Sequence, residues 1–294
     1  MIIRPVAIVV FVSATASCGL IACTAPSDGA GAQGVQVNEN PMDEWFAIYL
    51  AGIPSPDRQV TSAAMAEAQH ARAAILEMGE RAVGPLSRRW ESSSFTEKDA
   101  AWDLVLEIGP AVVPELRRRA HELSPTARIW AASARHHFGD ATAVGDLVAM
   151  LKSETPHVRH LAALALVFQG DVPPSAEEPA VAALVDALHS EAKLESTAFS
   201  VAGAALACLV AATGQPLLPP DKPIRFYNYV AFAFPPPVHP FPFASDYLGD
   251  APPDERAAIV AAAEAWWNAP GRTLSLRPIQ PTWPRAELDA SSRP

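Results

Sequence analysis

Small and apolar residues recur along the middle of the chain with a period of about 30 residues. The recurring glycines are spaced 30, 30 and 31 residues apart, and they are Gly79, Gly109, Gly139 and Gly170. An alanine lies eight positions before each glycine, namely Ala71, Ala101, Ala131 and Ala162. Because a helix-period apolar pattern resumes on both sides of each glycine, every period predicts two helices joined at a glycine turn.

Helix start signals repeat in the same register. Ser124-Pro125 and Thr155-Pro156 lie 31 residues apart. Each pair places a hydroxyl at the N-cap and a proline at the first helical position, where its missing N–H costs nothing. Residues 96–99, Thr-Glu-Lys-Asp, have the form of a capping box. A bundle of Ala-rich helices has no reason to keep this register, so the pattern predicts a stack of helical hairpins.

The repeat resembles the HEAT repeat, in the short form known from phycobilisome lyases. The matching positions of the third unit are Arg128, Ala131, Ala132, Phe138, Gly139, Asp140, Ala143, Val144 and Leu147. The resemblance covers about residues 60–214 and implies an all-α, right-handed α-solenoid of four to five HEAT-like hairpins, with second helices lining the concave face. It implies a fold and no activity, because the lyases act on bilin proteins in the cytoplasm.

Other segments complete the predicted solenoid, which spans residues 43–214. A helix starting near Pro41 and stopped by Gly52 and Pro54 caps the first unit. Residues 172–178 form an insertion before the second helix of unit four, at about 179–190, and a degenerate fifth unit has a helix at 197–213.

The C-terminal region differs in composition. Eleven of residues 215–253 are proline and eight are Phe or Tyr, which predicts a Pro/aromatic-rich loop rather than another repeat. A capping helix within 254–273 and a disordered tail at 274–294 follow. The loop aromatics either form an exposed anchor for a partner or pack over the open end of the solenoid. The candidates are Tyr227, Tyr229, Phe232, Phe241 and Phe243.

The N-terminus predicts export. Residues 1–22 have one cationic side chain and then an apolar run, as in a secretory signal peptide. The segment ending Leu20-Ile21-Ala22-Cys23 resembles the lipobox of bacterial lipoproteins, which implies acylation of Cys23 and a membrane anchor. Residues 23–42 are a flexible tether, and Thr24 after the cysteine favours the outer membrane or cell surface over the inner membrane. An uncleaved signal anchor and simple secretion are the alternatives, and all three place the protein outside the cytoplasm.

Charge narrows the choice of partner. A net charge of -10 argues against nucleic acid, which requires an excess of clustered cations. Five arginines nevertheless cluster on the predicted second helices of units one and two: Arg88, Arg89, Arg117, Arg118 and Arg119. They form either a site for an anion or acidic peptide, or a solvated face that is ion-paired to nearby acids such as Glu91, Glu115 and Glu122.

We find no catalytic motif and expect no cofactor. His136, His137, His157 and His160 lack the companions of a zinc site, so a position on the surface or packing between repeats is the better interpretation. Cys208 lies in an apolar context and is predicted to be a core residue. The sequence therefore predicts a membrane-tethered, non-catalytic scaffold that binds another envelope protein or peptide. The alternative is an accessory or ligand-binding module of an envelope enzyme, with its site in residues 215–253.

Overall fold

The computed structural model describes residues 41–53, 59–194, 199–218, 226–227, 243–244, 247–272, 274 and 276. The chain divides into two units, Met1–Glu39 and Asn40–Pro294, and the second contains all of the described residues. The predicted signal peptide, Cys23 and the tether up to residue 40 lie outside this range. No helix within the described residues is long and apolar enough to cross a bilayer.

Helices make up nearly all of the regular structure. They are α1 (Pro41–Ala51), α2 (Ser62–Glu77), α3 (Val83–Arg89), α4 (Phe95–Ile108), α5 (Val113–Arg119), α6 (Pro125–His137), α7 (Ala141–Met150), α8 (Pro156–Phe168), α9 (Pro174–Ala187), α10 (Val201–Thr213), α11 (Tyr247–Asp250) and α12 (Pro253–Trp267). Short 3-10 segments are η1 (Gly79–Ala82), η2 (Pro110–Val112) and η3 (Ala120–Glu122). Two-residue strands are β1 (Phe226–Tyr227) and β2 (Phe243–Ala244).

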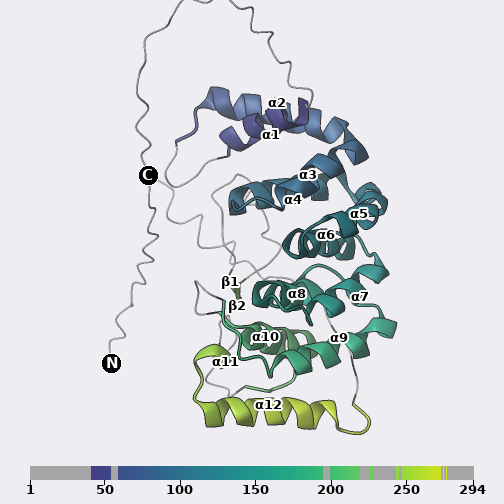
Figure 1. Cartoon of the computed structure of the whole chain (residues 1–294), viewed down its shortest axis with the longest axis vertical. Coiled ribbons are helices and arrows are strands. Elements are labelled where there is room, and N and C mark those ends of the chain that lie inside the picture. The colour runs from purple at the N-terminus through teal and green to yellow at the C-terminus, as the bar shows by residue number, and fades with distance from the viewer. Residues whose placement is uncertain are drawn as a thin grey trace, which may run out of the picture. The chain divides into compact units, whose positions relative to one another are not determined.

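The helices stack in two rows (Figure 1). The first helices of successive units, α2, α4, α6, α8 and α10, each contact the next in one row. In the second row α3 contacts α5 and α7 contacts α9. Each unit buries one face of its hairpin against its neighbours, which is how a repeat too small for its own core gains stability. The predicted all-α, HEAT-like solenoid is confirmed.

The recurring alanines explain how closely the first helices pack. Ala71 is 2% exposed, and Ala101, Ala131 and Ala162 are completely buried. A methyl side chain lets two helix backbones approach with no loss of side-chain entropy. The period seen in the sequence is therefore the period of the inter-repeat contact.

The turn glycines serve two different purposes. Gly79, Gly109 and Gly139 have φ of 55°, 89° and 77°, in the left-handed region where a side chain is strained. Gly170 lacks a positive φ, but a Cβ there would lie 2.4 Å from the backbone oxygen of His136. Three glycines are therefore required by the turn, and the fourth by a close approach of the preceding unit.

The start of α4 differs from the prediction. Its N-cap is Ser94, whose hydroxyl accepts a hydrogen bond from the backbone N–H of Glu97 at 3.3 Å. Thr96, the predicted cap, lies inside the helix. Ser94 and Glu97 have the spacing of a capping box as well, and Ser94 is the residue that caps the helix.

The prediction that residues 172–178 form an insertion before the second helix of unit four is wrong. Helix α9 begins at Pro174, so most of that segment belongs to the helix, and Pro179 lies within it. Pro174 is tolerated because the first helical N–H groups have no partner in any case, whereas Pro179 removes one internal hydrogen bond. In unit five, α10 begins at Val201, after the N-cap Ser200, and not at residue 197.

Both ends of the stack are covered by helices. Helix α1 packs on α2 and buries Met42 and Phe46 to 1% exposure. It begins at Pro41, two residues before the predicted boundary of the solenoid. Helix α12 contacts α9 and begins one residue before the predicted start at 254. The predicted capping helices at the two ends are therefore present.

The C-terminal region contains structure that the sequence did not predict. Strands β1 and β2 pair antiparallel, with Phe226 opposite Ala244, and α11 packs against α10. Leu276 is 7% exposed, so ordered contacts extend past residue 274, the predicted start of the tail. Tyr229, Phe232 and Phe241 lie outside the described residues, and only the backbones of Tyr227 and Phe243 are described. The two predicted roles of these aromatic side chains, as an exposed anchor or as a cover over the end of the solenoid, stay predictions.

Candidate binding site

The five candidate arginines lie at the C-terminal ends of two short helices. Arg88 and Arg89 are in the last turn of α3, and Arg117, Arg118 and Arg119 are in the last turn of α5. Cations are stabilised there by the partial negative charge of the terminal carbonyl groups. Because α3 and α5 are in contact, the structure brings the two sets together across one repeat boundary.

Arg89 holds the first helix in place. Its guanidinium lies 2.5 Å from the Asp43 carboxylate of α1 and 4.8 Å from the centroid of the Phe46 ring. The contact combines an ion pair with a cation–π interaction. Arg89 is therefore tied to the packing of α1 and is not available to a partner.

Arg119 is also committed to the fold. It lies 2.8 Å from Glu115 and 2.9 Å from Glu122, and its side chain is only 21% exposed. The guanidinium also rests against the backbone of α3, where a Cβ added to Gly84 would be 2.8 Å from Arg119 Nη2. Arg119 thus fills the space that the missing side chain at Gly84 leaves between α3 and α5.

Arg118 is paired but exposed. It donates two hydrogen bonds to Glu115, at 2.7 and 2.6 Å, while 57% of its side chain faces solvent. Hydrogen bonding to Arg118 is the main cause that lowers the pKa of Glu115 to about 2, and Arg119 adds to it. An exposed pair of this kind contributes little stability, so a competing carboxylate can replace Glu115 at small cost.

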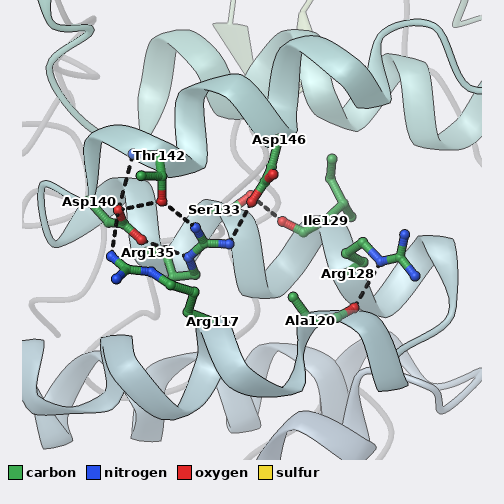
Figure 2. A network of polar contacts seen from close by, with 9 residues as sticks. All are labelled: Arg117, Ala120, Arg128, Ile129, Ser133, Arg135, Asp140, Thr142 and Asp146. Carbon is green, nitrogen blue, oxygen red and sulfur yellow. Dashed lines mark hydrogen bonds and ion pairs between the residues drawn. The ribbon is translucent and has the colours of Figure 1, made fainter.

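Arg117 lies at the edge of a buried polar network (Figure 2). Its Nη2 lies 2.9 Å from Asp140 Oδ1, with the arginine side chain 56% exposed. Asp140 also binds Arg135, whose other nitrogens contact Thr142 at 2.8 Å and Asp146 at 2.6 Å. Burial raises the pKa of Asp140, but hydrogen bonds from Thr142, Arg135 and Arg117 outweigh it and hold that pKa well below its usual range. The network joins α5, α6 and α7.

Arg88 is exposed, and in the part of the chain that the structure describes it forms no ion pair. Glu91, one of the acids expected to neutralise the cluster, instead accepts hydrogen bonds from the Ser124 backbone N–H at 2.8 Å and hydroxyl at 2.5 Å. The cluster therefore separates into two groups. Arg89 and Arg119 are structural, and the three that face solvent are Arg88, Arg117 and Arg118. We call the latter three the arginine edge.

His136 and His160 connect repeats, as the packing interpretation expects. His136 Nε2 lies 3.3 Å from the carbonyl oxygen of Leu166 in the next unit, and His160 Nδ1 lies 3.1 Å from that of Ser200. Burial lowers the pKa of His136, which favours its neutral form. Among the residues with described positions, no group of three or more His, Cys, Asp or Glu side chains is arranged to hold a metal ion.

Cys208 is a core residue, as predicted. It is fully buried in α10, and its thiol donates a hydrogen bond to the carbonyl oxygen of Ala163 at 3.2 Å. Burial raises the pKa of the thiol, which disfavours the reactive thiolate.

Sequence reasoning missed an acidic row on α4. Asp99, Asp103 and Glu107 are four residues apart and share one face of the helix, toward α1 and α2. Burial is the main cause that raises the pKa of Asp99 to about 7 and that of Asp103 to about 8. Arg72 of α2 pairs with Glu107 at the outer end of the row. The regular spacing of four was visible in the sequence.

Comparison with known proteins supports the fold. Residues 110–202, from η2 to the start of α10, match the family model of HEAT repeats. No curated protein sequence matches the chain. The matched stretch contains the third unit and both of its neighbours, whose stacking the structure shows. Residues 110–202 therefore resemble HEAT repeats in sequence, and they lie within the stack of helical hairpins.

Proposed function

We propose that this protein is a non-catalytic scaffold that binds another protein or peptide in the bacterial envelope, and that it is tethered to the membrane through acylated Cys23. HEAT repeats commonly present an extended surface for protein partners, because each repeat adds to the same continuous face. That general role is the part of the proposal that the family match supports. The partner, the tether and the compartment are inferences from the residues.

The arginine edge carries the proposal. On a chain with a net charge of -10, Arg88, Arg117 and Arg118 extend into solvent from neighbouring helices of adjacent repeats. Guanidinium groups recognise carboxylates through paired hydrogen bonds, and an exposed guanidinium loses little hydration when it does so. An acidic peptide segment fits this surface best, because its carboxylates can compete with Glu115 and Glu122 for the exposed guanidinium of Arg118.

The binding test uses a defined acidic probe. Fluorescence polarisation of labelled hexaglutamate with the purified full-length chain in detergent is expected to show salt-sensitive binding. Arg88→Glu combined with Arg118→Gln should weaken it about tenfold or more, while Arg81→Glu, which makes the same charge change as Arg88→Glu but lies in η1 before the start of α3, should leave it unchanged. Equal binding by wild type and double variant would show that the arginine edge is not the site.

A second measurement asks whether the edge serves a protein partner. Chemical crosslinking in intact cells, followed by affinity purification, should recover discrete partner bands with the wild type and the Arg81→Glu control. The double variant should lose them. Partner bands that persist at full intensity in the double variant would exclude the arginine edge as the docking surface.

The tether is tested separately. If Cys23 carries the lipid, metabolic labelling with an alkyne fatty acid should mark the wild type and Cys18→Ser, but not Cys23→Ser. Cys23→Ser should also appear in the soluble fraction, because a tether without acyl chains has no apolar anchor. Labelling of Cys23→Ser would contradict the assignment.

A further inference from the structure

Arg128 and Arg159 occupy the same position in consecutive repeats but have different surroundings. Arg128 donates hydrogen bonds to the carbonyl oxygens of Ala120 at 2.9 Å and Leu123 at 3.2 Å (Figure 2 shows the first). It thereby satisfies the carbonyl groups at the end of the preceding second helix. Arg159 Nε is buried, yet no hydrogen-bond partner for it exists among the described residues.

The reason for the difference lies in the preceding helix. After α5 the chain continues into the 3-10 segment η3, which presents its carbonyl groups to Arg128. After α7 no such segment follows, and Lys152 N–H instead closes a turn on Ala149 O at 3.1 Å. Arg159 is therefore left without the carbonyl groups that its equivalent binds.

A cavity of about 220 Å³ lies at Arg159. Its apolar wall includes Leu151, Ala183 and Val201, which are 4%, 5% and 0% exposed. Lys152 also lines it, at the C-terminal end of α7. The cavity thus combines an apolar wall from three helices with two cationic side chains.

The cavity is lined by two cationic side chains and one carboxylate, and none of the three forms an ion pair with the described residues. Within the described ranges neither Lys152 nor Arg159 has a carboxylate within ion-pair distance. Asp186 of α9 also lines the cavity, and it forms no ion pair with the described residues. Two like charges near a partly buried space favour an anion between them, since a guanidinium and an ammonium both gain charge-assisted hydrogen bonds from a carboxylate.

We propose that this cavity, between α8, α9, the start of α10 and the residues that follow α7, binds a carboxylate attached to a carbon that bears an aliphatic side chain. Arg159 and Lys152 hold the carboxylate, and the wall formed by Leu151, Ala183 and Val201 takes the side chain. The volume of about 220 Å³ has room for the aliphatic side chain and carboxylate of one residue. Two sources share this chemistry, the C-terminal residue of a peptide and a free amino acid, whose ammonium would face Asp186. The site is independent of the arginine edge.

Isothermal titration of the purified full-length chain in detergent tests the assignment with four probes. They are N-acetyl-leucine, N-acetyl-leucinamide, acetyl-Ala-Ala-Leu with a free C-terminus, and free leucine. N-acetyl-leucine is expected to bind and the amide to bind at least about tenfold more weakly, because the amide lacks the charge. Tighter binding of the peptide than of free leucine identifies a peptide C-terminus as the source, and the reverse order identifies a free amino acid.

Variants connect the binding to the two cations. The Lys152 side chain is exposed, so the Lys152→Gln variant is expected to fold normally. Both Lys152→Gln and Arg159→Gln should weaken N-acetyl-leucine binding about tenfold. Arg159→Lys should recover part of the loss, and Arg81→Gln should bind as the wild type does. Circular dichroism melting checks that each variant is folded. Absence of binding by every carboxylate probe, or unchanged binding in folded Lys152→Gln and Arg159→Gln, would overturn the proposal.

Discussion

Arg135 Nε lies 2.8 Å from Asp140 Oδ2 inside the hairpin of α6 and α7, and the two residues are only 2% and 8% exposed. This contact closes the turn at Gly139, because Asp140 is also the N-cap of α7. One carboxylate therefore joins the end of the first helix to the start of the second.

Breaking this pair from one side should destabilise the fold. We expect Asp140→Ala to lower the free energy of unfolding by about 2–4 kcal/mol, because it leaves the buried Arg135 with Asp146 as its one carboxylate partner and removes the cap of α7. Urea denaturation measures the change. Arg118→Gln, which breaks an exposed pair, is the control and should cost less than about 1 kcal/mol. Similar losses in both variants would contradict the structural role of the buried pair.

The acidic row on α4 predicts an unusual dependence of stability on pH. Asp103, next to Asp99 and Glu107 and opposed by Arg72, has a pKa raised from 3.8 to about 8, chiefly by burial. A carboxyl group with a raised folded-state pKa binds its proton more tightly in the folded chain. Its contribution to stability is fully present below pH 3.8 and is lost as the pH rises to about 8.

We therefore expect Asp103→Asn to raise the urea midpoint above that of the wild type at pH 9, by more than it does at pH 6. The amide cannot ionise, so the variant avoids placing a charge in the interface with α1 and α2. Asp43→Asn, at the exposed Arg89 contact, is the control and should show no such pH-dependent gain. A wild-type midpoint that does not fall between pH 7 and pH 9 would contradict the prediction.

The two proline-led helix starts provide a matched comparison. Ser124 accepts a hydrogen bond from the Ala127 N–H at 3.2 Å, whereas Thr155 at the same position of the next unit makes no side-chain capping bond. Loss of the cap in Ser124→Ala should lower the free energy of unfolding by about 1 kcal/mol, and loss of the hydrogen bond from Ser124 to Glu91 should add to this decrease. Thr155→Ala should be close to neutral. Equal effects in chemical denaturation would show that the caps are equivalent in solution.

Two of the turn glycines should differ in how strongly a substitution by alanine destabilises the fold, because one has a positive φ and the other is in close contact with a neighbouring backbone. Gly139→Ala places a side chain at φ 77°, which costs about 1–2 kcal/mol. Gly170→Ala meets the backbone oxygen of His136 at 2.4 Å, where neither partner can move without shifting α6 or α8. We expect Gly170→Ala to be the more destabilising variant in urea. A smaller loss at Gly170 than at Gly139 would show that the two units can separate.

The repeat itself was visible in the sequence because it depends on local rules. A small residue in each inter-helix contact, a glycine at each turn and a hydroxyl or proline at each helix start depend on residue type and spacing, and each appears once per period. Errors occurred where two local interpretations were equally good. Ser94 and Thr96 both fit a capping box, and the prolines in residues 172–178 suggest a loop although α9 accommodates them.

The roles of individual charged residues could not be predicted in this way, since they depend on which other repeat lies opposite. Arg88 and Arg89 are neighbours in the sequence, but only Arg89 meets Asp43 of α1. Likewise the sequence places Arg128 and Arg159 in equivalent positions, but η3 follows α5 and not α7. An ion pair or a cavity requires atoms from distant segments at distances of a few ångströms, and these are set by packing.

The sequence by itself thus determined the all-α repeat, its period and its two capping helices, because these follow from hydrophobic spacing and turn chemistry within about 30 residues. Only the tertiary structure decided which arginines face solvent, which carboxylates are buried and that Arg159 Nε has no hydrogen-bond partner among the described residues. These properties arise where α3 meets α5, where α1 and α2 cover α4, and where α8, α9, α10 and the end of α7 border a cavity.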